Sequence, residues 1–361
     1  MPNFNGTSPR SDCRRAYPWS VPDPSYRSRS LWLDTVPGSL EPRPSMSRDE
    51  QVDVAIVGAG YTGLWTAYYL RRADPTLRIA ILESEIAGFG ASGRNGGWCS
   101  ALFAVEPARL AREYGPPAAI AMQRAMEDTV DEVGKVSADE GIDCHFVKGG
   151  TTRFATRPAH VERMQAEVAS GHALGFTEDD ECWLDADAAR GRIAVAGQIG
   201  AVYSPHCAAI HPARLARGLA EVVERAGVTL YEQTPVQLID GRKVRTPSGT
   251  VTADVVVRAT EAWTATLPGT ERSVVPIYSL MLATEPLPSE FWDEVGWAGR
   301  ETMSDGRHLI IYGQRTADDR IAFGGRGAPY HFGSRIRPEY DRVESVFVDV
   351  RRVLAAVRPP A

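Results

Sequence analysis

A spacing of three glycines constrains this chain more than any other feature of its sequence. Positions 58–63 are G-A-G-Y-T-G, and they follow a run of apolar and β-branched residues at 52–57. Residues 64–70 are typical of a helix, a second apolar strand is expected over 78–82, and Glu83 stands 20 positions after Gly63. This strand–turn–helix–strand order, with an acidic residue at the end of the second strand, predicts a dinucleotide-binding unit of the Rossmann type.

Each residue of this unit has a physical role in holding a diphosphate. Gly58 permits the tight turn, Gly60 lets the backbone approach the phosphates closely, and Gly63 lets the helix pack against the strand. The first turn of the helix presents free N–H groups and a partial positive charge to the phosphates. Glu83 can accept hydrogen bonds from a ribose diol. We therefore expect a dinucleotide at this turn rather than a chance glycine loop.

A second glycine-rich stretch follows at residues 88–97, where Ser, Arg and Asn are mixed with the glycines. This composition is typical of backbone pressed against a ligand. The alternative is a surface loop, but Trp98, Leu102 and Phe103 come directly afterwards, which indicates that the chain turns back into the core. Arg94 can neutralise a phosphate in such a loop, or it can form a surface salt bridge instead.

The rest of the pattern predicts two domains that are interleaved along the chain. The elements expected beyond the glycine stretches are a mainly helical region at 106–206, a helix at 212–226, strands at 228–231, 234–238 and 254–260, a small β-meander at 241–249, β-structure at 273–284 and a hairpin formed by 308–313 and 320–325. A sheet made from such distant pieces predicts an α/β fold. In this fold a Rossmann-like dinucleotide-binding domain is interleaved with an antiparallel-sheet substrate domain.

The expected domain boundaries follow from the same pattern. They are 1–50 for an N-terminal extension, 51–104 and 208–270 for the dinucleotide-binding domain, 105–207 and 271–335 for the substrate domain, and 336–361 for a C-terminal tail. Within the extension, Trp19, Trp32 and Leu33 predict a segment that packs against the body of the protein.

Charge and cysteine content exclude several classes of function. The 46 acidic side chains exceed the 40 basic ones, the formal net charge is -6, and no dense Lys/Arg block occurs, so no nucleic-acid partner is expected. The apolar stretch 52–70 contains Asp53 and the three glycines, which predicts a strand, a turn and a helix rather than an integral membrane segment. The five cysteines are widely spaced without a C-x-x-C pair. We therefore expect no metal site and no disulfide framework, and reduced thiols favour the cytoplasm.

Several motifs together resemble the FAD-dependent amine and D-amino-acid oxidase superfamily. They are the segments 58–63, 91–97, 211–215 and 259–263 with Glu83. The stretches 278–288 and 324–330 are similar to its gamma-glutamylputrescine oxidoreductase branch, and the resemblance covers about residues 30–340. It implies FAD as the cofactor. Because only one dinucleotide motif is visible, a second site for NADPH is not expected, and electrons should pass from the flavin to oxygen or another acceptor.

The resemblance also implies which residues hold FAD. The glycine turn would cradle the pyrophosphate, Glu83 would hold the adenosine ribose, and residues 92–97 would run beside the pyrophosphate and the flavin. Val236 would meet the adenine through its backbone, Thr260 would pass near the phosphates, and Arg94 would face a phosphate or the reduced ring. The expected cofactor-binding residues are Gly58, Gly60, Tyr61, Thr62, Gly63, Glu83, Ser92, Gly93, Arg94, Asn95, Gly96, Gly97, Val236 and Thr260.

Aromatic and basic residues close to the predicted hairpin are the candidates for the substrate side. They are Tyr278, Tyr312, Arg326, Tyr330 and His331, with Tyr278 and Arg326 as the preferred pair. Tyr and Arg can orient an amine or a carboxylate by hydrogen bonds, although each of the five can also be a packed or interfacial side chain.

The expected reaction is oxidation of a C–N bond in an amine or amino acid, possible substrates being compounds like gamma-glutamylputrescine. Hydride passes from the carbon to the flavin and the imine hydrolyses, so the catalytic centre is the flavin and no side-chain base is obligatory. A NAD-dependent dehydrogenase and a truncated, non-catalytic flavoprotein remnant are the alternatives.

The end of the chain departs from the pattern of the superfamily. Its members normally continue into a Trp-Gly-rich segment, a glycine-rich turn and a last helix that close over the flavin ring. This chain ends at Ala361, after a stretch at 343–357 with helical character. If this is the whole natural chain, we expect weaker retention of the flavin and lower turnover.

Overall fold

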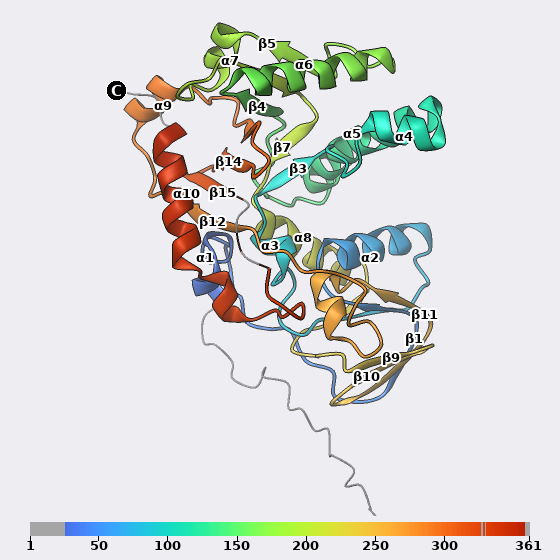
Figure 1. Cartoon of the computed structure of the whole chain (residues 1–361). Helices are drawn as coiled ribbons and strands as arrows, with labels where there is room; N and C mark the ends of the chain where they lie inside the picture. The colour runs from blue at the N-terminus through green and yellow to red at the C-terminus, as the bar shows by residue number, and fades with distance from the viewer. Residues whose placement is uncertain (1–25, 326–327, 329, 358–361) are drawn as a thin grey trace, which may run out of the picture.

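Two sheets built from distant pieces of the chain form the framework of the protein (Figure 1). The computed structural model describes residues 26–325, 328 and 330–357. The six-stranded sheet has the order β8-β2-β1-β11-β10-β9. Its strands are β1 (Glu50–Val57), β2 (Ile79–Leu82), β8 (Thr229–Tyr231), β9 (Leu238–Asp240), β10 (Lys243–Thr246) and β11 (Gly249–Arg258).

Burial on both faces explains the apolar run of the first strand. β1 lies between β2 and β11 and is parallel to both, with Val54 paired to Ile79 on one side and to Val255 on the other. Helices α2 (Tyr61–Ala73) and α8 (Pro212–Arg225) cover one face of this sheet. Ile56 on β1 and Leu64 on α2 are fully buried there. A strand enclosed in this way must be apolar on both sides, as the sequence pattern predicts.

The seven-stranded sheet has the order β12-β15-β14-β13-β4-β6-β5. Its neighbouring strands are antiparallel except for β13 and β4, which are parallel. The strands are β4 (Thr151–Ala155), β5 (Cys182–Leu184), β6 (Gly200–Ser204), β12 (Leu280–Ala283), β13 (Thr302–Asp305), β14 (Ile311–Arg315) and β15 (Ile321–Gly325). The hairpin of β14 and β15 confirms the one expected from the sequence.

Helices surround the second sheet and join it to the first. Those that pack on or near it are α6 (Pro158–Ala173), α7 (Ala186–Arg192), α9 (Ser289–Val295) and α10 (Glu344–Val357). α10 runs along β12 and β15 (Figure 1), and it buries Val346 and Val350 in the same core as Phe323. These valines are four residues apart and therefore share one helix face.

A small ribbon lies between the two sheets. It pairs β3 (Trp98–Ser100) with β7 (Cys207–Ala209) in antiparallel fashion. α4 (Pro107–Tyr114) and α5 (Pro116–Asp139) follow β3 in the chain, and α5 contacts both strands of the ribbon. Because β7 also contacts β13, the ribbon connects the glycine-rich segment 88–97 to the seven-stranded sheet.

The N-terminal segment packs on the body, as Trp32 and Leu33 predict, while Trp19 lies outside the described residues. After the short turn η1 (Tyr26–Arg29), helix α1 (Leu31–Asp34) buries Trp32 and Leu33. The Trp32 indole Nε1 donates a hydrogen bond of 2.8 Å to the Asn95 carbonyl. The extension is thus attached to the second glycine-rich stretch.

Two strand predictions are wrong in extent. Residues 234–237 form a loop, and strand β9 begins only at Leu238. The loop forms because the Thr234 amide donates a hydrogen bond to the Glu83 carbonyl, which bends the chain around the end of β2. Within 273–284, only Leu280–Ala283 is a strand. Apart from Glu50, the strands of the six-stranded sheet come from the segments predicted for the dinucleotide-binding domain, and those of the seven-stranded sheet from the segments predicted for the substrate domain. The domain boundaries themselves stay a prediction.

Candidate active site

The glycine turn between β1 and α2 has the tight geometry that its sequence predicts. Gly58 has a φ of +105°, and a Cβ there would collide with the Ala259 carbonyl oxygen. A Cβ on Gly63 would overlap the carbonyl oxygen of Gly58, because the helix packs directly on the turn. Gly63 is buried, but Gly58 and Gly60 are partly exposed. One side of the turn therefore exposes its backbone to a ligand, and the other side is packed against the start of the helix.

The start of α2 lies beside the short helix α3 (Ala91–Arg94). The Tyr61 amide donates a hydrogen bond of 2.9 Å to Ser92 Oγ, and a Cβ on Gly60 would lie 2.9 Å from the same oxygen. The Ser92 hydroxyl therefore faces the turn, as expected of a residue near the diphosphate. The Tyr61 ring points away, since its hydroxyl donates to the Pro212 carbonyl, and the Thr62 side chain is exposed.

Glu83 braces the glycine turn at the end of β2. Its Oε2 accepts a hydrogen bond of 2.8 Å from the Ala59 amide, and its Oε1 accepts one of 3.0 Å from the Glu85 amide. Burial raises the pKa of this carboxyl group, and the two amide hydrogen bonds offset part of that rise. The carboxylate thus has a supporting role in the turn, and its contact with a ribose stays a prediction.

The second glycine-rich stretch is held by its own asparagine. Asn95 Oδ1 accepts from the Gly97 amide at 2.7 Å, and its Nδ2 donates to the Ser92 carbonyl at 2.9 Å. Gly97 has a φ of +68°, and Gly93 packs so closely on Gly88 that a Cβ there would overlap its carbonyl oxygen. The stretch is an ordered turn against the core, so the surface-loop alternative is wrong.

Gln314 joins this stretch to the second sheet, and sequence reasoning missed it. Its side chain is fully buried, and Nε2 lies 2.9 Å from the carbonyl oxygens of both Gly96 and Gly97. Gln314 and Tyr312 are two positions apart on β14 and point to the same side of the sheet. Gln314 lies one residue beyond the strand predicted at 308–313, and the observed strand extends to Arg315. Continuing the alternation of that strand by one residue was the available signal.

Arg94 forms an ion pair with the C-terminal tail. Its Nη1 lies 2.9 Å from Asp341 Oδ2, and its guanidinium group lies over the Phe89 ring, 4.9 Å from the centroid. This is the salt-bridge alternative for Arg94. The Arg94 Nε atom is buried without a hydrogen-bond partner, so one donor of the guanidinium remains available.

The two remaining cofactor candidates lie at the ends of the first sheet. Thr260 follows β11, its amide nitrogen is close to the Gly58 turn, and its Oγ1 lies 2.8 Å from Thr264 Oγ1. Val236 packs on the sheet from the loop before β9. Val236 is only partly buried, and its contact with the adenine stays a prediction.

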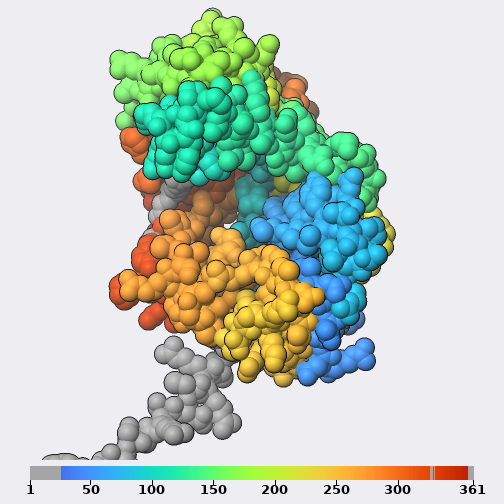
Figure 2. All heavy atoms as spheres, turned by 90° about the vertical axis from the view of Figure 1, so that its right-hand side faces the viewer, coloured from blue at the N-terminus to red at the C-terminus, as the bar shows by residue number. Residues whose placement is uncertain are grey.

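A cavity of about 990 Å³ opens beside this cofactor region. Ala91 and Arg94 of α3 line it on one side, and the end of β11 with the 3₁₀ turn η2 (Glu261–Thr266) lines it on another. Residues 273–283 and the tail residues around Asp341 complete the wall. On another face of the molecule, Figure 2 shows a hollow between the teal helices α4 and α5 above and the blue α2 and orange residues near 270 below. The region between the two sheets is therefore accessible to small molecules.

The structure brings only some of the substrate candidates together. Tyr312 faces the cofactor region, because its ring lies against Gly96 and its hydroxyl forms a hydrogen bond of 2.7 Å with Ser279 Oγ. Tyr278 lines the large cavity and packs edge to face with His331, at 5.5 Å between ring centroids. His331 in turn stacks on Tyr340 of the tail, with ring centroids 3.3 Å apart.

The other two candidates are not part of this group. Tyr330 is about half exposed, and its hydroxyl accepts a hydrogen bond of 3.2 Å from the Ser334 amide in its own loop. Arg326, one of the preferred pair, lies outside the described residues. The hydrogen-bonded pair of Tyr312 and Ser279 is therefore the better-placed polar group beside the cofactor region.

A comparison with protein-family models matches residues 53–360 to the family of FAD-dependent oxidoreductases named DAO. The chain belongs to the DAO family. Relatives include a probable oxidoreductase OrdL of Haemophilus influenzae, 27% identical over 78% of this chain and 66% of the relative, and gamma-glutamylputrescine oxidoreductase of Escherichia coli, 28% identical over 84% of this chain and 70% of the relative. Glycine oxidase of Geobacillus kaustophilus is 27% identical over 81% of this chain and 79% of the relative.

Solved structures show the same fold. Glycine oxidase from Geobacillus kaustophilus aligns with a TM-score of 0.65 at 24% identity, over 86% of this chain and 79% of the other. L-proline dehydrogenase from P. horikoshii aligns with a TM-score of 0.67 at 19% identity, over 86% of this chain and 78% of the other. The predicted fold class is confirmed.

Membership of the DAO family also confirms FAD as the cofactor and sets aside the NAD-dependent alternative. The geometry fits a dinucleotide with a diphosphate bridge, because the exposed backbone of Gly58 and Gly60, the start of α2 and the Ser92 hydroxyl face one corner. No helix within residues 26–325, 328 and 330–357 is long and apolar enough to cross a membrane.

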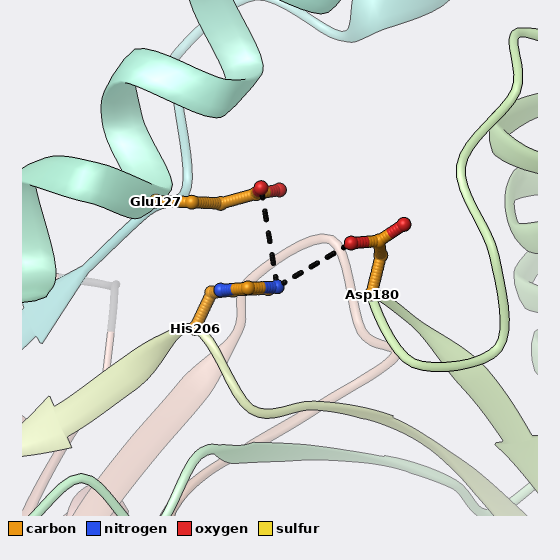
Figure 3. Close-up of side chains that lie close together, drawn as sticks. All are labelled: Glu127, Asp180 and His206. Carbon is orange, nitrogen blue, oxygen red and sulfur yellow. Dashed lines mark ion pairs between the residues drawn. The ribbon is translucent and has the colours of Figure 1, made fainter.

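A cluster of two carboxylates and a histidine is formed by Glu127 of α5, Asp180 before β5 and His206 between β6 and β7 (Figure 3). His206 Nε2 lies 3.7 Å from Asp180 Oδ1 and 3.9 Å from Glu127 Oε2. Such a set can ligate a cation. However, Arg124 Nη1 already donates to both carboxylates, and this guanidinium lowers the pKa of Asp180. A metal ion would have to displace Arg124, so the DAO-family chain uses the cluster as an ion-pair network that joins α5 to the loop before β5.

Proposed function

We propose that this chain uses FAD to oxidise the C–N bond of an amine or an amino acid. The observation that supports this most is the contact between the two sheets, where Tyr312 and Gln314 of the second sheet reach the Gly96–Gly97 turn of the cofactor region. A substrate bound at this contact would lie next to the cofactor. Relatives named gamma-glutamylputrescine oxidoreductase and glycine oxidase act on such nitrogen compounds and support the same class of reaction.

The proposed cofactor site uses mainly backbone groups. The turn at Gly58 and Gly60 and the Ser92 hydroxyl, which the Tyr61 amide orients, would hold the diphosphate, Glu83 the ribose and Val236 the adenine. FAD, when bound, would supply a two-electron acceptor for the carbon that carries the nitrogen. Because the cofactor carries this chemistry, the protein contributes binding, orientation and a partly enclosed site.

On the substrate side, the Tyr312 hydroxyl and Ser279 would orient the substrate. Their hydrogen bond of 2.7 Å fixes the direction of the tyrosine hydroxyl, and Tyr278 supplies an aromatic wall in the adjoining cavity. Hydrolysis of the oxidised product outside the site would release the nitrogen. We propose oxygen as the final electron acceptor and a compound like gamma-glutamylputrescine as the substrate. The four cysteines of the described chain are free, in keeping with a proposed location in the cytoplasm.

Anaerobic reduction of the bound flavin by amines tests this proposal directly. The full chain, loaded with FAD, is mixed without oxygen with gamma-glutamylputrescine, with glycine and with a hydroxy acid as control. We expect an amine, and not the hydroxy acid, to bleach the flavin absorbance, and air to restore it with release of peroxide. A protein that retains FAD but is bleached by none of the amines would be the non-catalytic remnant, and the proposal would be wrong.

A further inference from the structure

A second, smaller cavity of about 200 Å³ lies beyond Gln314, on the side away from Tyr312 and Ser279. Segments from five parts of the chain line it, and the proposed function uses none of their charged groups. We call it the arginine pocket, and it is defined by His145, His211, Arg214, Arg300, Thr316 and Asp318. Its volume is about a fifth of that of the large cavity, so it suits a small ion rather than a nucleotide.

Arg300 contributes a cation without a partner of opposite charge. Its Nε donates to the Arg315 carbonyl at 3.1 Å, and its Nη1 lies 3.4 Å from the His145 carbonyl. Among the described residues, no carboxylate forms an ion pair with it. Arg300 is largely buried, and both this burial and the nearby Arg315 lower the pKa of its guanidinium. The nearby Asp319 and Asp318 carboxylates offset part of this fall in pKa, but neither bonds to Arg300, whose partners are the two backbone carbonyls.

Arg214 is the second cation and is only half satisfied. Its Nη1 lies 2.9 Å from Asp143 Oδ2, but the Asp143 side chain is 76% exposed, which leaves this pair well hydrated. The Arg214 Nε is buried without a hydrogen-bond partner. A free donor on a pocket-lining guanidinium is what an oxygen of a bound anion would satisfy.

The acidic side of the pocket does not cancel these charges. Asp318 lies at the exposed mouth, where its Oδ2 accepts from Arg320 Nε at 2.9 Å and its Oδ1 accepts from Thr316 Oγ1 at 2.6 Å. Asp143 pairs with Arg214, Asp318 with Arg320, and Asp319 with Arg315, so among these groups Arg300 is the guanidinium left without a carboxylate partner. The pocket therefore carries an excess of positive charge.

The two histidines are neutral walls. His211 Nδ1 accepts from the Arg214 amide at 3.2 Å, so its Nε2 donates to Thr35 Oγ1 at 2.9 Å. Burial and the nearby Arg214 lower the pKa of His211 to about 3. His145 packs edge to face on His211, and burial and Arg214 lower its pKa as well. The positive charge of the pocket thus belongs to the arginines alone.

Backbone strain adds an independent sign of a built site. His145 and Arg300 both have a positive φ, of 56° and 52°, in the left-handed region that residues other than glycine rarely adopt. Strain of this kind clusters at ligand sites, where the surroundings hold it in place. Here the two strained residues contact each other across the pocket through the Arg300–His145 hydrogen bond.

We propose that the arginine pocket binds a small oxyanion through Arg300 and Arg214. The shared chemistry is a compact group with two or more acceptor oxygens, either a phosphate or a carboxylate. Gln314 separates the pocket from Tyr312, so the anion would lie next to the turn at Gly96 and Gly97 without entering the substrate side. The inference stands on these contacts and does not depend on the proposed oxidation of amines.

Titration of the FAD-loaded full chain with inorganic phosphate, with succinate and with chloride at constant ionic strength tests the inference. Heat of binding and the thermal midpoint are both recorded. We expect saturable binding of phosphate or succinate, with a rise in the midpoint, and none of chloride. The arm that saturates at lower concentration identifies the source of the oxyanion. Absence of saturable binding in both arms would overturn the proposal.

Matched variants assign the binding to the pocket. We expect Arg300→Gln to weaken binding at least tenfold and Arg112→Gln, at an exposed position on α4, to leave it unchanged. Equal affinity of the two variants would overturn the assignment. Asp318→Asn should change the affinity for the anion in the opposite direction. Removing the carboxylate at the mouth should tighten binding, and weaker binding would contradict the inference. The flavin absorbance of each variant, which we expect to be unchanged, separates this result from the test of the proposed function.

Discussion

The proposed cofactor side and the proposed substrate side of the site are built from different kinds of chemical group. The cofactor side uses backbone: glycines 58, 60 and 63, the amide of Tyr61 and the turn at Gly97. The substrate side uses side chains, above all Tyr312 with Ser279. A backbone site tolerates almost no change at its glycines, because a Cβ has nowhere to go. A side-chain site can be altered residue by residue, so it is the part of the fold on which specificity can change.

The largest effect is expected where backbone packs on backbone. In Gly63→Ala, the new Cβ would overlap the Gly58 carbonyl oxygen, so the turn must open. We expect a loss of about 3 kcal/mol in the free energy of unfolding, together with loss of FAD binding. Urea unfolding and FAD titration measure the two effects. Gly191→Ala is the matched control, because no atom lies within 4 Å of its built Cβ. If the two variants were equally stable, the backbone of the glycine turn would tolerate change as well as a side-chain site does, contrary to our expectation.

The next effect tests the point where the two sides meet. Gln314→Leu removes the donor that serves the Gly96 and Gly97 carbonyls. The Gly97 oxygen keeps its hydrogen bond of 2.8 Å from the Ile210 amide, but the Gly96 oxygen loses its partner. We expect a loss of about 2 kcal/mol in the free energy of unfolding, and weaker FAD binding. The exposed Gln237→Leu serves as control in the same denaturant series. If Gln314→Leu kept full FAD affinity, the two sides would be independent of each other.

A smaller effect, confined to turnover, is expected on the substrate side. Tyr312→Phe keeps the ring against Gly96 but removes the hydroxyl bonded to Ser279. We expect kcat/KM for an amine to fall about tenfold, equivalent to about 1.4 kcal/mol, with FAD affinity unchanged. Tyr330→Phe alters a hydroxyl bonded only within its own loop and should have no effect on kcat/KM. A drop in FAD affinity for Tyr312→Phe would place this tyrosine on the cofactor side instead.

The smallest effect concerns the ion pair between Arg94 and Asp341. Both side chains are partly exposed, at 19% and 30%, so the pair is screened by solvent. A double-mutant cycle with Arg94→Gln and Asp341→Asn should give a coupling energy below about 1 kcal/mol for unfolding. A larger coupling would mean that the tail is an integral wall of the cofactor side.

The backbone part of the site was predictable from the sequence, because its constraints are local. A tight turn, close approach of the backbone to a ligand and close packing of the helix all require glycine at fixed spacing. The strand before Gly58 is apolar because it is buried on both faces, and this is visible in the sequence. Ser92 also lies where the glycine-rich segment predicts, next to the start of α2. The roles of Arg94 and Glu83 were less determined, since a charged group can bond to a ligand or to the protein itself.

The side-chain part was predictable only in outline. Tyr312 and Tyr330 are both tyrosines near the hairpin, yet one faces Gly96 and the other lies half exposed on its own loop. What separates them is the register of β14 against β15 and the position of the sheet above the cofactor turn. Both depend on contacts between residues far apart in the chain. For the same reason Gln314 was not found, although it shares a strand face with Tyr312.

The hydrogen bond from Gln314 to Gly96 spans 218 positions of the chain. During synthesis, the turn at Gly96 and Gly97 is made first, and the residue that locks it follows 217 to 218 positions later. This turn therefore takes its final shape only after Gln314 has emerged from the ribosome. Until that moment a nascent chain that already has its glycine turn still lacks the bonds that keep the neighbouring loop in place.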